Sequence, residues 1–231
     1  MLLFHGHRVA VALDWLLNMR KSSGPMTKTS KNRWGKAIQS KDVQHELKRL
    51  AILKTAAKLF NQRGFRETSL NDLAEELQVT KPTLYYYVEN KEDILFQCLL
   101  TAITQLLERI ETIQDSNATG ADKLGQFIHV FTSVFDDEFG RCVSSPGPGP
   151  LSEKYMTAID PLYDKLDAAT RTIIECGIGD GSLRQCNPKI ITFTLLGAIN
   201  WMTRWYQIGG EMTTREVANE MVALFNKGLS K

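Results

Sequence analysis

Apolar residues recur along most of this chain at intervals of three and four positions, which is the period of an amphipathic α-helix. Alternating stretches rich in Val, Ile and Thr, which would predict strands, are scarce, and internal repeats are absent. The pattern therefore predicts an all-α protein of eight helices, or nine if a short helix forms near residues 151–156.

Glycine, proline and short polar side chains mark the ends of these helical stretches. The eight predicted helices cover approximately residues 43–63, 69–77, 80–90, 91–114, 122–139, 160–176, 188–208 and 214–229. Asp160 before Pro161 has the order of an N-cap followed by a proline in the first helical turn. Prolines alternate with glycines before residue 151, so we expect the segment 144–150 to be a loop.

The second and third predicted helices are short and follow a longer one. Ser69, with Asp72 three residues later, resembles a capping box, and Thr68 is the alternative cap. Thr80 and Pro82 then open the next helix as N-cap and first-turn proline. This order is typical of a helix-turn-helix, whose second short helix enters the major groove of DNA. Seven apolar residues are expected to pack these helices together and against the first: Leu70, Leu73, Ala74, Leu77, Val79, Leu84 and Val88.

The remaining face of the third predicted helix has an unusual composition for a solvated surface. It carries Lys81, Thr83 and some of the three consecutive tyrosines at positions 85–87, which cannot all belong to the core. Hydroxyl groups bind phosphate, and aromatic edges contact thymine methyl groups. Lys91 and the helix N-terminus offer further phosphate contacts. The alternative, three partly buried tyrosines with ordinary hydrogen bonds, leaves the rest of the pattern unexplained.

Motif residues are dense throughout this part of the chain. They are Ala57-x-Leu59-Phe60, Gly64-Phe65, Thr68-Ser69, Leu73-Ala74, Val79, and Pro82-Thr-Leu-Tyr85 with Tyr87, Asn90 and Lys91. In these residues the chain resembles the TetR family of transcription regulators, over about positions 43–95. The resemblance implies that Lys81 and Tyr85 read bases. It implies a DNA-binding set of Thr68, Ser69, Thr80, Lys81, Pro82, Thr83, Tyr85, Tyr86, Tyr87 and Lys91.

The net charge of +2 conceals a basic segment near the N-terminus. Residues 20–50 hold nine Lys or Arg and two acidic residues, a net charge of +7, so the rest of the chain carries −5. Such a segment favours contact with nucleic acid, and a solvated linker is the alternative. We expect a basic, flexible extension over 1–42, with Met26 as an alternative start, a DNA-binding domain over 43–90, and a ligand-binding and dimerisation domain over 91–231.

The family resemblance implies that the helices after residue 91 form an effector pocket, and that 188–208 and 214–229 form the dimer interface. Helical spacing places Asn200 and Arg204 on one face and Trp201 beside them. A buried arginine needs an anion or several acceptors, so Arg204 is expected to hold a polar or acidic ligand group, or else to form a structural salt bridge or dimer contact. This stretch looks like that of family members that respond to acyl-CoA or fatty acids. The expected ligand-binding residues are Phe127, Phe131, Met156, Tyr163, Phe193, Asn200, Trp201 and Arg204.

Other classes of function find less support. The four cysteines lack C-x-x-C spacing, so we expect small buried thiols in a reducing cytoplasm and neither a metal site nor a disulfide. No apolar run approaches the ~18–20 residues of a membrane span. Common nucleophile, phosphate-binding and metalloprotease motifs are missing, so we expect no enzyme and no cofactor. We expect a homodimeric repressor that an effector releases from a palindromic operator; an activator, an architectural DNA binder and a protein-interaction module are the alternatives.

Overall fold

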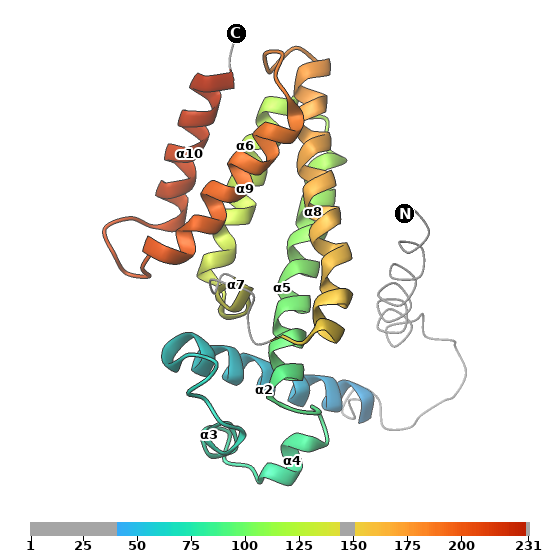
Figure 1. Ribbon diagram of the computed structural model, residues 1–231, viewed down its shortest axis with the longest axis vertical. Coiled ribbons are helices and arrows are strands. Elements are labelled where there is room, and N and C mark those ends of the chain that lie inside the picture. The colour runs from blue at the N-terminus through green and yellow to red at the C-terminus, as the bar shows by residue number, and fades with distance from the viewer. Residues whose placement is uncertain (1–40, 144–150, 230–231) are drawn as a thin grey trace, which may run out of the picture.

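The computed structural model describes residues 41–143 and 151–229 (Figure 1). Over these ranges the chain forms α-helices and one 3-10 helix and no strand, which confirms the predicted all-α class. The elements are α2 (Lys41–Arg63), α3 (Leu70–Glu76), α4 (Lys81–Tyr85), α5 (Lys91–Gln114), α6 (Gly120–Thr132), η1 (Ser133–Asp136), α7 (Glu138–Val143), α8 (Glu153–Gly179), α9 (Pro188–Trp205) and α10 (Thr214–Leu229). The expected loop over 144–150, and the expected extension apart from its last two residues, lie outside the described residues.

The long helix α5 connects two groups of helices. Figure 1 shows α2, α3 and α4 at one end of the molecule, and α5 rising from them to lie beside α8. The first turns of α5 pack into a core shared with α2, α3, α4 and α7. Its later turns pack into a second core shared with α6, α8, α9 and α10. A displacement of α5 would therefore alter the packing of both groups of helices.

The short helices α3 and α4 begin where the sequence predicts, and α3 has the predicted capping box. The Ser69 hydroxyl accepts a hydrogen bond from the Asp72 N–H at 3.2 Å, and the Asp72 carboxylate accepts from the Ser69 N–H at 2.7 Å, which completes the capping box. Leu84 is fully buried and anchors α4 to the core. Val79 is an exception to the predicted packing set, because it is 38% exposed in the turn between α3 and α4.

Helix α4 is shorter than predicted. It ends at Tyr85 instead of near residue 90. Asn90 has an extended backbone, and its side chain accepts a hydrogen bond from the Asp93 N–H at 2.8 Å, so it is the N-cap of α5.

The predicted helix over 122–139 is divided into α6, η1 and α7. Asp137 has an extended backbone, and its carboxylate accepts hydrogen bonds from the N–H groups of Phe139 and Gly140, which starts α7. A Cβ on Gly140 would overlap the carbonyl oxygen of Val134. Glycine thus permits the tight turn that separates α7 from η1.

The prediction that a helix starts at Asp160 is wrong. Helix α8 begins seven residues earlier, at Glu153, and continues through Pro161. Proline has no N–H to donate to the carbonyl of residue 157, but Ile159 and Leu162 on either side of it are buried and hold the helix against the core.

The cysteines follow their prediction in part. All four are free thiols; Cys98 and Cys142 are buried as expected, whereas Cys176 is exposed. Within the described ranges, no set of three or more His, Cys, Asp or Glu side chains is arranged to hold a metal ion. Among the helices described, none has the length and apolar character that a membrane span requires.

Candidate nucleic-acid interface and effector cavity

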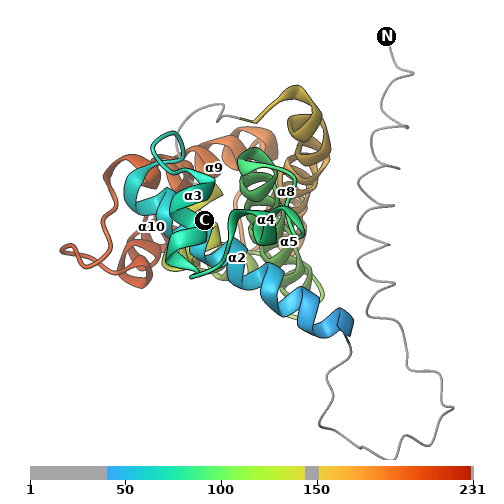
Figure 2. The same ribbon diagram turned by 90° about the horizontal axis from the view of Figure 1, so that it is seen from below.

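The outer surface of α4 lies at the end of the molecule farthest from the α9–α10 helices, and Figure 2 views the chain from this end. Lys81, Pro82 and Thr83 are exposed, as are Tyr85 and Tyr86, at 51% and 74%. These five residues therefore share one accessible surface. Thr80 is exposed beside them, and its hydroxyl lies 2.8 Å from the Thr83 hydroxyl instead of capping the helix.

Tyr87 is half-buried and takes part in an aromatic group that the sequence did not reveal. Its ring lies 4.7 Å from the His45 ring of α2 and 5.1 Å from the Tyr86 ring, between centroids. The Tyr86 ring also meets His45 edge-on, at 5.4 Å. His45 thus packs against Tyr86 and Tyr87 and orients their rings. These residues are distant in the sequence, so the contact could not be predicted from it.

Two residues of the expected DNA-binding set, Thr68 and Lys91, have partners within the chain. Thr68 is only 2% exposed, and its hydroxyl donates to the Gly64 carbonyl at 2.9 Å. The Lys91 ammonium donates to the carbonyl oxygens of Phe65 and Thr68, both at 2.8 Å, and of Arg66 at 3.2 Å. The burial of Thr68 and the three carbonyl partners of Lys91 disfavour a phosphate contact by these side chains in this conformation. Both instead hold the turn between α2 and α3.

A polar network joins the start of α5 to α2. Asp93 is 9% exposed, and its carboxylate accepts from the Glu89 N–H at 3.0 Å and from the Gln97 amide at 2.8 Å. The Gln97 carbonyl oxygen accepts from Arg49 of α2. Arg49 also donates to Glu46, and this hydrogen bond lowers the pKa of the Glu46 carboxyl. The buried carboxylate is thus satisfied by donors, and the network couples the first two turns of α5 to α2.

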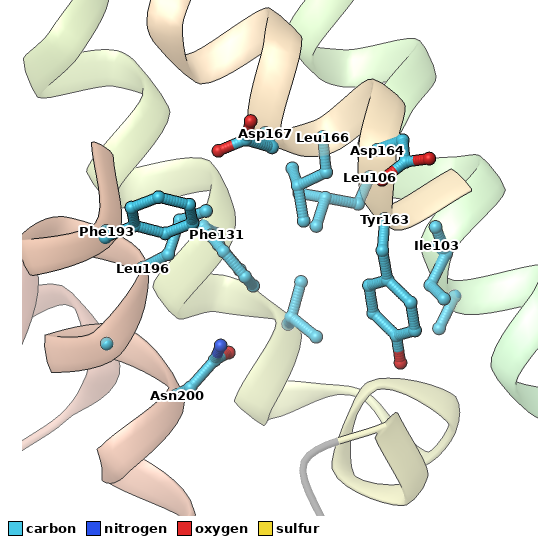
Figure 3. A pocket seen from close by; sticks show the side chains of 13 residues that line it. Ile103, Leu106, Phe131, Tyr163, Asp164, Leu166, Asp167, Phe193, Leu196 and Asn200 are labelled. Atoms are coloured by element: carbon cyan, nitrogen blue, oxygen red, sulfur yellow. The ribbon is translucent and has the colours of Figure 1, made fainter. Parts of the chain in front are cut away.

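A cavity of about 490 Å³ lies between α5, α8 and α9, with α6 and η1 at one side (Figure 3). Its lining is mostly apolar. It consists of Ala102, Ile103, Leu106, Phe131, Val134, Tyr163, Asp164, Leu166, Asp167, Phe193, Leu196, Gly197 and Asn200. A cavity of this size and character fits a small organic molecule.

Four of the eight expected ligand-binding residues line this cavity: Phe131, Tyr163, Phe193 and Asn200. Phe127 does not, because it is fully buried and packs edge-on against Phe131 with centroids 5.8 Å apart. Met156 lies in the first turn of α8, outside the lining.

Trp201 and Arg204 also fall outside the cavity. Trp201 is 64% exposed, and Arg204 is exposed, with its guanidinium 5.9 Å from the Trp201 ring centroid. Arg204 is therefore not buried at this cavity, because it lies on the opposite side of α9 from its core residues, and its position fits the alternative of a dimer contact. Sequence reasoning missed Asp164 and Asp167, although their three-residue spacing on a helix was a readable signal.

The outer face of α9 and α10 is strongly apolar and uncovered in the single chain. Its largest exposed side chains are Ile190 at 59%, Phe193 at 53%, Trp201 at 64%, Trp205 at 47% and Leu224 at 69%. Large exposed apolar side chains that gather on one helix, as Ile190, Trp201 and Trp205 do on α9, mark a place where another molecule binds.

Known proteins share both halves of this architecture. Residues 52–98 match the family described as bacterial regulatory proteins, tetR family, and residues 117–229 match the tetracyclin repressor-like C-terminal domain. The HTH-type transcriptional repressor KstR2 of Mycobacterium tuberculosis is 25% identical over 191 residues, which are 78% of this chain and 92% of KstR2.

Solved structures agree with these matches. The TetR family regulator PfmR from Thermus thermophilus superposes with a TM-score of 0.71 at 28% identity, over 78% of this chain and 99% of PfmR. AibR, in complex with isovaleryl coenzyme A and operator DNA, has the same fold, with a TM-score of 0.68 at 24% identity over 76% of this chain and 96% of AibR. The two matched regions and the shared architecture show that this chain belongs to the TetR family of bacterial regulatory proteins.

Proposed function

We propose that this chain is a transcription repressor that binds a palindromic operator as a homodimer and leaves it when a small, largely apolar effector fills the cavity. The observation that carries the proposal is that one helix, α5, serves both sites. It begins with Lys91, bonded to the turn between α2 and α3 that leads into the helix-turn-helix, and its residues Ile103 and Leu106 line the cavity. The relatives named as repressors support the direction of regulation.

The proposed DNA-binding domain spans residues 43–90, and α4 is its recognition helix. Lys81 and Tyr85 are exposed and free to meet base edges, whereas Thr83 and Tyr86 are placed to meet phosphates. Ser69, exposed at the start of α3, offers a further phosphate contact. Thr68 and Lys91 contribute by holding the turn.

The proposed effector and dimerisation domain spans residues 91–231. Two copies that bury the apolar face of α9 and α10 against each other would be related by a two-fold axis and present two α4 helices. Such a pair reads two half-sites about one helical turn of DNA apart, roughly 34–36 Å, which explains the expected palindrome. Because an operator lies on the genome, the protein acts in the cytoplasm.

The effector has a large apolar part in this proposal, because the cavity wall is mostly hydrocarbon. An acyl-CoA or fatty acid is one candidate, and the AibR complex with isovaleryl coenzyme A is the related case. Occupation of the cavity would shift α5 and with it the spacing of the two α4 helices. This requires that the effector binds the released conformation more tightly than the DNA-bound one.

Fluorescence anisotropy with the DNA upstream of the protein's own gene tests the proposal. We expect tight binding that weakens steeply as salt rises, because phosphate contacts release counterions. Tyr85→Ala should weaken binding about tenfold or more, within the ~1–3 kcal/mol of a base contact. Glu175→Ala, the loss of an exposed side chain outside both α4 and the cavity lining, should leave it unchanged. Equal affinity for this DNA and a scrambled duplex, or equal effects of both substitutions, contradicts the proposal.

A further inference from the structure

The charged side chains that line the cavity are all acidic. Asp164 and Asp167 both line it from α8, and among its described lining residues none is Lys, Arg or His. An apolar ligand with an anionic end would therefore meet like charge on this wall. A ligand with a cationic end would meet opposite charge, and the attraction is stronger at the partly buried Asp167 than it would be in water.

Asp167 has capacity to bind a donor. Its Oδ2 accepts a hydrogen bond from Arg171 at 2.5 Å, one helical turn away. Its Oδ1 is buried and has no hydrogen-bond partner, and the Nε of Arg171 beside it is likewise buried without one. Buried polar atoms are nearly always hydrogen-bonded, so this oxygen is a position that a bound donor would satisfy. Since Arg171 balances one of the two carboxylates, the wall keeps a net negative charge.

The other polar side chains fit the same ligand. Figure 3 shows Asn200 reaching into the space from α9, across from the two aspartates on α8. An amide is neutral and offers a further acceptor to a cation. Burial, together with the charge of Asp160, raises the pKa of the Tyr163 phenol, which therefore stays neutral near pH 7. The remaining wall, including Ile103, is hydrocarbon and fits the body of the molecule.

We propose that the effector is an apolar molecule that carries a protonated amine, with its ammonium group donating to the free Asp167 oxygen and with Asp164 adding negative charge to the same wall. The proposal rests on the effector cavity of the proposed function and specifies its ligand class. It favours an apolar amine over a fatty acid or an acyl-CoA, whose anionic groups find no cationic partner in the lining.

Isothermal titration of the full chain with three ten-carbon ligands tests this proposal, because they differ only in their head group. Decylamine should bind at least tenfold more tightly than decanoate, with decanol between them. Decanoyl-CoA serves as the fourth ligand and should bind no better than decanoate. Equal affinities, tighter binding of decanoate or decanoyl-CoA, or no binding of decylamine at millimolar concentration overturns the proposal.

Substitutions of Asp164 and Asp167 test whether these two residues cause the preference for the amine. Asp167→Asn should remove the preference for decylamine and strengthen decanoate binding, because it leaves Arg171 unpaired. Asp164→Asn, at an exposed carboxylate without this ion pair, should reduce the preference at least threefold even if Asp167→Asn destabilises the fold. Glu175→Gln, at an exposed position on the same helix outside the lining, is the control and should change nothing. An unchanged preference in both aspartate variants overturns the proposal.

Operator binding without ligand separates this inference from the proposed function. If the chain binds no operator, the proposed function fails, and the titrations still decide the head group that the cavity prefers. If the chain binds operator and decanoate releases it more effectively than decylamine, the function stands and the amine proposal is overturned.

Discussion

The side chain of Lys91 offers the sharpest test of how the helix-turn-helix is held. Its ammonium donates to three backbone carbonyls in the turn between α2 and α3 and lies 4.4 Å from the centroid of the Phe65 ring. Lys91→Met keeps the length and apolar character of the stem and removes the charged donor. The change therefore isolates the hydrogen bonds from the packing.

The expected cost follows from the number and burial of these bonds. Hydrogen bonds to a charged group contribute about 1.5–3 kcal/mol each. The bonds to the Phe65 and Thr68 carbonyls are partly buried, and water can replace the bond to the exposed Arg66 carbonyl. Water also reaches part of the bonds to the Phe65 and Thr68 carbonyls. We therefore expect Lys91→Met to lower the free energy of unfolding by about 2–4 kcal/mol, which is a large share of the ~5–15 kcal/mol of a typical domain.

Urea unfolding followed by circular dichroism measures this loss. Lys81→Met is the matched control, since that lysine is exposed on α4 and its loss should change stability by no more than about 0.5 kcal/mol. Operator binding should respond in the opposite order: Lys81→Met weakens it, whereas folded Lys91→Met keeps its dependence on salt. If Lys91→Met leaves stability unchanged and reduces the salt slope by about one, Lys91 binds phosphate and the reasoning fails.

Three further changes test the packing and capping of the helices. Leu84→Ala removes a fully buried side chain and should cost about 2–5 kcal/mol in thermal unfolding; a loss below about 1 kcal/mol would refute its role as the anchor of α4. Gly120→Ala would place a Cβ closer than 3.0 Å to the backbone of Gly177 and should lower the free energy of unfolding by about 1–3 kcal/mol or more. Gly179→Ala, whose added Cβ would have nothing within 4 Å, is the control and should not lower it. Equal effects of the two substitutions would contradict the close approach of Gly120 and Gly177. The backbone and hydroxyl hydrogen bonds of the capping box lower the pKa of Asp72 below 3.8, so its contribution is complete above that pH and is lost as the pH falls through the lowered value. The free energy of unfolding should fall between about pH 5 and about pH 3, and Asp72→Asn should make this fall smaller; an equal fall in the variant would contradict the contribution of Asp72.

The helix-turn-helix could be predicted from sequence because its determinants are local. The capping box of Ser69 and Asp72 needs only three residues of chain, and the buried positions Leu73, Ala74 and Leu84 follow helical spacing. The partners of Lys91 could not be predicted in this way. They lie 23 to 26 residues away, and an exposed lysine would give the same pattern.

The start of α8 shows a different limit. A proline that follows an aspartate favours a first helical turn, and that local preference is real. In this fold the buried residues on both sides of Pro161 keep the helix continuous. Tertiary packing therefore outweighs the local signal, and the cavity gains Asp164 and Asp167 from the middle of a long helix instead of from its end.

Helix α9 explains why two of the expected ligand-binding residues, Trp201 and Arg204, lie outside the cavity. Ile199 and Met202 are fully buried, whereas Trp201 and Trp205 are exposed on the outer side, with Arg204 beside them. Both sides are apolar and both follow the helical period, so the sequence pattern alone does not tell which side faces the cavity. A helix that is apolar on all sides must nevertheless bury all of them. Since the chain covers only one side, the other requires a second surface, and this requirement is the strongest argument for the dimer.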